Sequence, residues 1–222
     1  MSGYLIYHPK RIRSVFDNLV VYHDKTSGNQ DPYIWNNKFL HTYCHMSQIT
    51  PKIGDINFWI SGDQFPKFNY LYCDLVFKVL EKDYWKDRNQ IDKKDPIVDS
   101  QFAFQDHYRW ASIEHPYTRR KRFTLKADPE KSFQPQDGSG NLLDILPVLN
   151  SIGISLPTLR TNLVTSHGSK PMKLLPSDVD KIFKWLFAEA YKKIRGDDLE
   201  RIRKDHPELG SDFTQSETKG CS

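Results

Sequence analysis

The chain has 222 residues, of which 38% are hydrophobic and 13% aromatic, and this composition excludes an intrinsically disordered protein. Its 32 basic and 28 acidic residues give a formal net charge of +4, which permits an anionic partner without requiring one. Three scattered cysteines form no disulfide framework, and the sequence contains neither an apolar leader nor a run long enough to span a bilayer. We therefore expect a cytoplasmic protein that does not associate with membranes.

The first predicted elements are short and extended. Apolar runs predict strands at residues 4–8 and 18–24, and residues 9–18 resemble a helical turn. An aromatic, extended run follows at 35–47, and its HTYCH sequence (41–45) offers two histidines and a cysteine. On a strand the cysteine points away from the histidines, so we expect a structural role and no bound metal or cofactor.

The clearest alternation occurs at residues 56–61, at 70–85 and at 123–127, and each predicts a strand. In the first of them one face carries Ile56, Phe58 and Ile60, and the other carries Asn57, Trp59 and Ser61. A tryptophan among polar side chains is either covered by another element or lines a pocket.

The C-terminal third predicts a helix over residues 175–196, with Ser177 as N-cap and Gly196 as stop signal. Its apolar stripe consists of Val179, Ile182, Phe183, Leu186, Ala190 and Ile194. Strands early and helices late indicate an α+β fold around a curved, mostly antiparallel sheet with flanking helices and this C-terminal amphipathic helix. We expect one domain over residues 1–209, followed by a polar tail at 210–222.

Basic residues are densest around the strand at 123–127. If its apolar residues face the core, the basic side chains share the outer face and can lie along a phosphate backbone. The alternative is a solvated sheet face. A loop at 166–171 adds a histidine and a lysine without the Walker pattern. The predicted phosphate-binding residues are Arg119, Arg120, Arg122, Lys126, His167 and Lys170.

Residues 102–117 combine aromatic and polar side chains in a density that suits a pocket for a nucleobase. The alternative is an ordinary polar loop in which Trp110 anchors the core. The candidate acid/base residues of this segment are Asp106, His107 and His115. The candidate ligand-binding residues of the whole chain are Trp59, Asp55, Tyr108, Trp110 and Arg109.

Four runs, taken in order, resemble the second nucleotide modification-associated domain family over residues 18–190. They are LVVYHDKTSGNQDPYIWNNKFLHTYCHMSQITPKIGDINFWISG, YLYCDLVFKVLEKDYWKD, KKDPIVDSQFAFQDHYRW and SHGSKPMKLLPSDVDKIFKWL. The chain has HMSQIT where the family is more basic, and SHGSK where the family is nearer to Gly-His-Lys. The resemblance implies a link to bacterial and phage systems that handle modified nucleobases, and it does not separate enzymes from binding proteins.

The stretch PKIGDINFWISGD is also similar, over this short length, to the PUA-like base readers of the EVE, ASCH and YTH groups. That likeness implies a small β-barrel as the alternative fold, with Trp59 as a wall of an aromatic pocket. The first functional hypothesis is thus a module that binds nucleic acid or a nucleotide. The alternatives are an enzyme that modifies nucleotides or nucleobases, and an accessory subunit for protein interactions.

Overall fold

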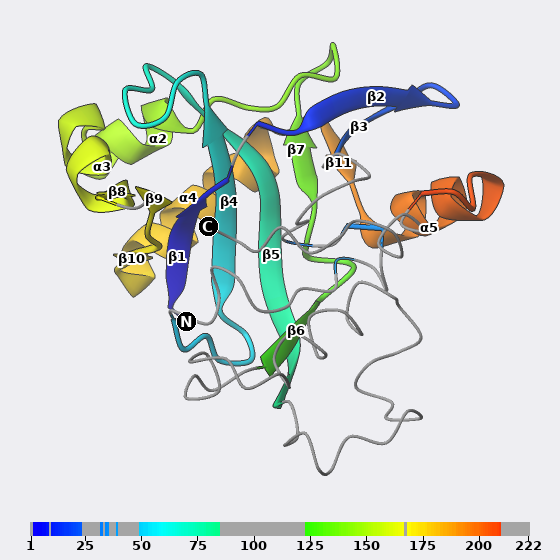
Figure 1. The fold of residues 1–222 in the computed structure, drawn as a ribbon, viewed down its shortest axis with the longest axis horizontal. Coiled ribbons are helices and arrows are strands. Elements are labelled where there is room, and N and C mark those ends of the chain that lie inside the picture. The colour runs from blue at the N-terminus through cyan, green and yellow to red at the C-terminus, as the bar shows by residue number, and fades with distance from the viewer. Residues whose placement is uncertain are drawn as a thin grey trace.

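The computed structural model describes residues 2–8, 10–23, 32, 34, 35, 39, 49–84, 123–166 and 168–209. Within these ranges the fold is α+β and centres on a five-stranded sheet with the order β10-β1-β4-β5-β6 (Figure 1). The strands are β10 (Met172–Leu174), β1 (Gly3–Tyr7), β4 (Ile56–Gly62), β5 (Leu71–Tyr84) and β6 (Phe123–Ala127). All pairs are antiparallel except β1 with β4, so the predicted mostly antiparallel α+β sheet is confirmed.

The sheet is open, and the alternative of a small closed barrel is wrong. Its edge strands are β10 and β6. Strand β4 pairs with the first part of β5, up to Lys78, whereas β6 pairs with the part from Val79 onwards. The edge formed by β6 therefore extends away from β10, and the two edges do not meet.

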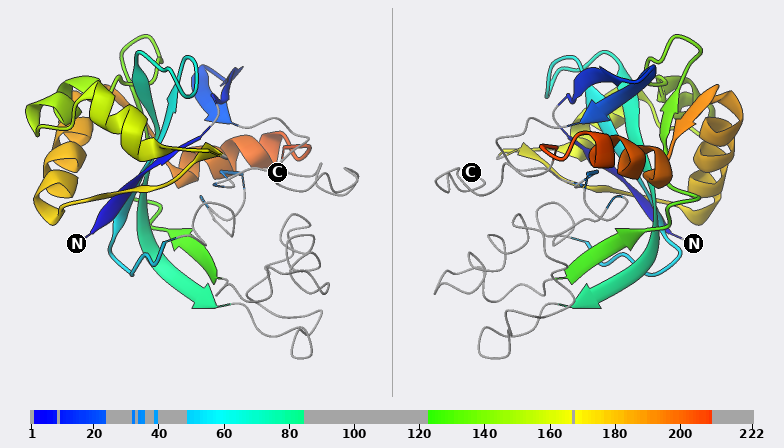
Figure 2. Two further views of the ribbon diagram at one scale, coloured as in Figure 1. Left: turned by 60° about the vertical axis from the view of Figure 1, so that its left-hand side comes forward. Right: turned by 90° about the vertical axis from the view of Figure 1, so that its right-hand side faces the viewer.

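One face of this sheet is covered by three helices, α2 (Leu146–Ser151), α3 (Leu156–Leu163) and α4 (Pro176–Glu189), as Figure 2 shows. The apolar side chains of β4 that were predicted to share a face all point into this layer. The core between sheet and helices includes Leu5, Ile56, Phe58, Ile60, Val76, Val179, Ile182 and Leu186. No helix within the described ranges is long and apolar enough to cross a bilayer.

The C-terminal helix differs from its predicted bounds at both ends. Helix α4 has Leu175 rather than Ser177 at its N-cap and ends at Glu189. The chain then forms β11 (Lys192–Ile194), which pairs with β7 (Gln134–Gln136), and Gly196 opens α5 (Gly196–Asp205). The reason is that Ile194 does not extend the apolar stripe of α4. It is buried with α5 on the other face of the sheet.

Residues 9–18 do not form the predicted helical turn. Strands β2 (Ile12–Phe16) and β3 (Leu19–His23) form an antiparallel hairpin instead. Its two turn residues, Asp17 and Asn18, have φ angles of 44° and 72°. Asp and Asn tolerate this left-handed conformation better than most residues, and two such residues in succession favour a tight hairpin.

The hairpin is fixed to the rest of the fold by two glutamines of β7. The buried carboxamide of Gln134 accepts a hydrogen bond from Tyr22 N at 3.0 Å and donates one to Tyr22 O at 2.6 Å. Gln136 Nε2 donates to Val20 O at 2.8 Å. The hydrogen bonds from these side chains satisfy backbone groups of β3 that a neighbouring strand would otherwise bind. They also hold the residues just before β2 over the second face of the sheet, which is the face opposite α2, α3 and α4.

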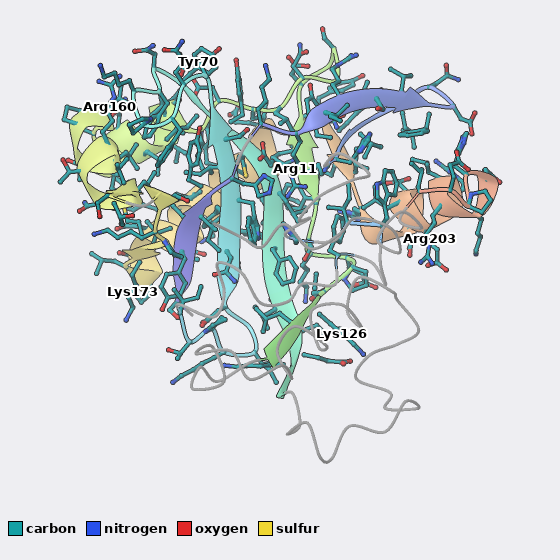
Figure 3. All side chains as sticks on the ribbon, viewed as in Figure 1. Arg11, Tyr70, Lys126, Arg160, Lys173 and Arg203 are labelled. Atoms are coloured by element: carbon teal, nitrogen blue, oxygen red, sulfur yellow. The ribbon has the colours of Figure 1, made fainter. Side chains whose placement is uncertain are left out.

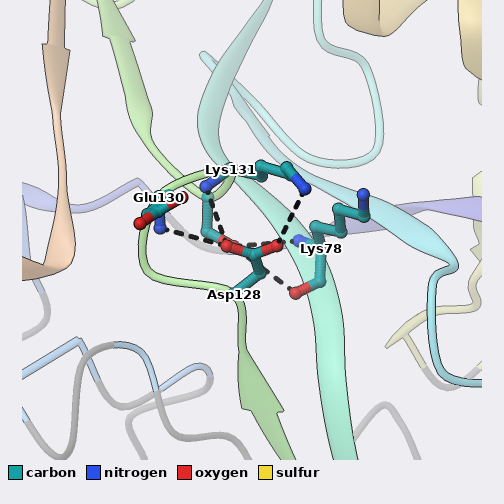
Figure 4. Close-up of polar contacts among 5 residues, drawn as sticks. Lys78, Asp128, Glu130 and Lys131 are labelled. Atoms are coloured by element: carbon teal, nitrogen blue, oxygen red, sulfur yellow. Dashed lines mark hydrogen bonds and ion pairs between the residues drawn. The ribbon is translucent and has the colours of Figure 1, made fainter.

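The connection from β6 to β7 is held by Asp128 (Figure 4). Its Oδ1 accepts hydrogen bonds from Glu130 N and Lys131 N, both at 3.1 Å, and its own N–H donates to Lys78 O at 2.8 Å. An aspartate that bonds the backbone two and three residues ahead stabilises a turn. The remaining short strands, β8 (Val164–Thr165) and β9 (Gly168–Ser169), pair with each other.

Candidate ligand-binding face of the sheet

The second face of the sheet carries Trp59, which is fully buried. It belongs to a cluster of buried side chains that includes Leu199 and Ile202 of α5, together with Trp35 and Phe39. Figure 2 shows α5 on the opposite side of the sheet from α2, α3 and α4. The tryptophan is therefore covered in this structure, and a ligand reaches its ring only when covering side chains move.

A buried ion pair lies on the same face. The pairing of β4 with β5 shifts between Trp59 and Ile60, and this bulge leaves Asp74 as an extra residue of β5. Asp74 Oδ1 accepts a hydrogen bond from Ser61 Oγ at 2.7 Å, and its Oδ2 lies 3.7 Å from Arg11 Nε. The side chains of Arg11 and Asp74 are both fully buried, and Figure 3 labels Arg11 close to β5.

Burying two charges costs several kcal/mol per ion before their attraction is counted, so such a pair is weak evidence for stability. Bulges occur next to functional sites, because they redirect one side chain of a strand. Arg11 and Asp74 are thus candidates for a functional role.

His8 extends this polar group onto the neighbouring strand. Its N–H donates to Ile60 O at 2.8 Å, which places it at the end of β1 beside Ser61. The imidazole lies 6.0 Å from the Trp59 ring, measured between centroids, in an edge-to-face arrangement. His8 is 4% exposed.

Asn57 is the most informative residue on this face. Its side chain is fully buried between Tyr4 of β1 and Phe77 of β5. Within the part of the chain that the structure describes, neither its Nδ2 nor its Oδ1 has a hydrogen-bond partner. Leaving such groups unpaired costs about 1–3 kcal/mol, so an unpaired buried amide requires an explanation. A carboxamide also presents a donor beside an acceptor, which matches the edge of a nucleobase.

Asp55, the other predicted ligand-binding residue in this region, has structural contacts. Its carboxylate accepts hydrogen bonds from Ser2 N, Ser2 Oγ and Lys52 N, each at 2.8 Å. Burial raises the pKa of this carboxyl, but these hydrogen bonds lower it by more, and the net pKa lies below the ordinary value. Asp55 therefore ties the chain start to the turn before β4, and its contact with a ligand stays a prediction.

Two predicted phosphate-binding lysines lie far apart. Lys126 is on edge strand β6, where its Nζ lies 3.4 Å from Glu81 Oε2. Lys170 is exposed and lies two residues before the strand at the opposite edge, β10. Four strand spacings of about 4.8 Å separate the two edges by on the order of 19 Å. The two lysines do not form one compact phosphate site.

The other sequence-predicted residues lie outside the described residues. They are Asp106, His107, Tyr108, Arg109, Trp110, His115, Arg119, Arg120, Arg122 and His167. The HTYCH sequence and the predicted tail at 210–222 lie there too. Among the residues that are described, no group of three or more His, Cys, Asp or Glu side chains is placed to hold a metal ion.

Sequence reasoning missed most of the polar group on this face. Asn57 and Ser61 were placed beside Trp59 by the alternation, but no role was assigned to them. Asp74 offered a signal, because it is a charge between the apolar residues Cys73 and Leu75 in the first half of the strand. For Arg11 the sequence contained no such signal, because only the folded hairpin brings Arg11 to Asp74.

Comparisons with known protein families, with curated proteins and with solved structures found no match for this chain.

Proposed function

We propose that the protein is a binding module for a nucleotide or nucleic acid, and that it holds a nucleobase against the second face of the sheet. The observation that carries the proposal is the buried, unpaired carboxamide of Asn57, two residues from Trp59 on the same face of β4. A base edge would supply the missing donor and acceptor, and binding would recover the cost of the unpaired amide.

In this proposal Asn57 reads the base edge and Trp59 stacks on the base. Stacking of a base on an aromatic side chain contributes about 1–3 kcal/mol. Because both side chains are fully buried, binding is coupled to movement of the covering side chains, to which Trp35 and Phe39 of the same cluster belong. The energy needed for that movement reduces the observed affinity.

The sequence adds further roles to the proposal. Trp110 and Tyr108 would extend the aromatic wall, and Asp106, His107 and Arg109 would contact the ligand. The resemblance to the second nucleotide modification-associated domain family suggests that the bound base is a modified one. The alternatives, a nucleobase-modifying enzyme and a protein-interaction subunit, rest on the sequence alone.

The test is a binding screen by calorimetry with nucleosides and nucleotides, both unmodified and modified, on the wild type and on Asn57→Leu. Leucine matches asparagine in shape but offers no hydrogen bond. We expect binding by the wild type and a loss of about tenfold or more in the variant, since hydrogen-bond groups of the ligand are left unpaired. If no compound binds the wild type, or if the variant binds as well, the proposal is wrong.

A further inference from the structure

We infer that the outer edge of β2 is an interaction surface, and that its partner is β2 of a second copy of this chain. The two strands pair antiparallel, so that the two hairpins form one four-stranded sheet with the order β3-β2-β2-β3. This surface is separate from the proposed nucleobase site, and none of the residues assigned to the base takes part in it.

Strand β2 has an open outer side. Figure 1 shows the β2–β3 hairpin at the rim of the fold, and side chains of β7 bind the backbone of β3 rather than that of β2. Within the described ranges no strand other than β3 pairs with β2. Ile12 is 38% exposed and Val15 is 59% exposed. Exposed β-branched residues on an edge strand that has neither a proline nor a bulge are typical of a strand that pairs with another chain.

The hydrogen-bond pattern of the hairpin identifies the backbone groups of β2 that point outwards. A two-residue turn joins Phe16 to Leu19, so these two residues exchange hydrogen bonds, as does every second pair along the hairpin. The residues between them on β2, Arg13 and Val15, therefore direct their N–H and C=O groups away from β3. The same alternation makes Tyr22 an outward-facing residue of β3, and a side chain of β7 binds both of its backbone groups.

Two copies of β2 satisfy all of these outward groups in one register, with Ser14 opposite Ser14. Arg13 then lies opposite the partner's Val15, and the two residues exchange both hydrogen bonds. The two-fold symmetry repeats this exchange between Val15 and the partner's Arg13. Centring the pair on Val15 instead would place Arg13 opposite Asp17, which lies in the turn, and centring it on Arg13 would place Val15 opposite Arg11, outside the strand.

The side chains that meet in this register are complementary. Ile12 lies opposite the partner's Phe16, and aromatic and β-branched residues form favourable cross-strand pairs. The exposed Arg13 lies opposite the partner's Val15, which its aliphatic stem can cover. Its guanidinium is diagonal to the partner's Asp17, which is also exposed, and a long side chain spans this distance. This charge complementarity favours a second copy of the chain over an unrelated extended peptide.

The first test is sedimentation equilibrium of the full chain over a range of concentrations. One strand pairing is at the weak end of protein interfaces, so we expect dissociation in the micromolar range and an average mass that rises from 26.1 kDa toward twice that value. Val15→Pro removes an outward N–H but none of the hydrogen bonds to β3, so the hairpin should persist. We expect this variant to dissociate about tenfold or more too readily to match the wild type, because the proline lacks one donor of the pairing and its ring obstructs the partner strand.

Two lysine variants form a matched pair. Val15→Lys places a cation opposite the partner's Arg13 and should weaken the dimer, because like charges directly opposite are unfavourable. Ile53→Lys changes another exposed apolar residue, which is 68% exposed and lies outside β2, and it should leave the dimer unchanged.

Disulfide cross-linking tests the register, in a background where Cys44 and Cys221 are replaced by serine. Ser14→Cys brings its Cα to about 4.5 Å from that of the partner's residue 14, which a disulfide can bridge. Arg13→Cys leaves the two cysteines in diagonal positions about 7–8 Å apart, beyond that reach. We expect a covalent dimer from Ser14→Cys and none from Arg13→Cys.

The outcomes are distinct. A wild type that stays monomeric at the highest concentration overturns the inference and leaves the edge of β2 to an extended peptide of another protein. Dimerisation of Val15→Lys equal to that of the wild type also overturns it, as does cross-linking of Arg13→Cys as fast as that of Ser14→Cys. If Val15→Pro fails to fold, Val15→Lys and the cross-linking decide. Nucleoside binding should be equal in Val15→Lys and in the wild type, so either result leaves the proposed function intact.

Discussion

The substitution Asn57→Leu should stabilise the protein while it weakens ligand binding by about tenfold or more. In the folded chain the Asn57 carboxamide is fully buried, and it has no hydrogen-bond partner within the described residues. Removing an unpaired buried amide recovers about 1–3 kcal/mol of desolvation cost. Fitting the larger methyl groups of leucine between Tyr4 and Phe77 takes back about 1 kcal/mol, the low end of the cost of overpacking, because the two side chains have the same branching and number of heavy atoms. We expect a net gain in the free energy of unfolding of about 1–2 kcal/mol.

Gln134→Met provides the matched control. Gln134 is also a fully buried carboxamide, but both of its ends are hydrogen-bonded, to Tyr22 N and to Tyr22 O. Methionine would leave these two backbone groups without their partner. We expect this variant to lose about 1–3 kcal/mol, so the same kind of chemical change should have opposite signs at the two positions.

The assay is urea unfolding with fluorescence detection, supported by thermal melts. For a chain of this size 1 kcal/mol corresponds to about 2–4 °C in the melting temperature. Asn57→Leu should therefore melt higher than the wild type, and Gln134→Met should melt lower. If Asn57→Leu destabilises the protein as much as Gln134→Met does, the Asn57 amide is bonded in the folded chain. The proposed base reader would then lose its main support. A gain in stability with a loss of binding is the expected signature of a site that sacrifices stability for function.

Two further predictions concern buried charges. Arg11→Met alone should lower the free energy of unfolding in urea by about 3–5 kcal/mol, because it leaves Asp74 as a buried charge without this partner. The double variant Arg11→Met with Asp74→Leu should have a free energy of unfolding close to that of the wild type. Equal losses in both variants would contradict the ion-pair argument. For Asp55, whose folded pKa is lowered from 3.8, the carboxylate adds stability above pH 3.8 that is lost as the pH falls through the lowered pKa. Asp55→Asn should be less stable than the wild type near pH 7, and the difference should shrink in urea titrations below pH 3.8; a difference that stays constant with pH would refute this reasoning.

Local periodicity determined much of the fold. Alternation at 56–61 placed Ile56 and Trp59 on opposite faces, and both faces are buried as separate clusters. The helical period likewise located α4, although not its end. These features are readable because a strand repeats every two residues and a helix every 3.6, whatever surrounds them.

Tertiary structure decided the candidate site. Ile194 continues the helical stripe in sequence, but pairing of β11 with β7 draws it into a strand. Arg11 meets Asp74 because an Asp-Asn turn makes a hairpin, glutamines of β7 hold that hairpin in place, and a bulge in β5 leaves Asp74 as an extra residue. The turn is local, but the contacts of Tyr22 with Gln134 and of Arg11 with Asp74 join residues that are distant in sequence. Hydrogen bonds and charges depend on which groups meet after folding, and no local period encodes that meeting.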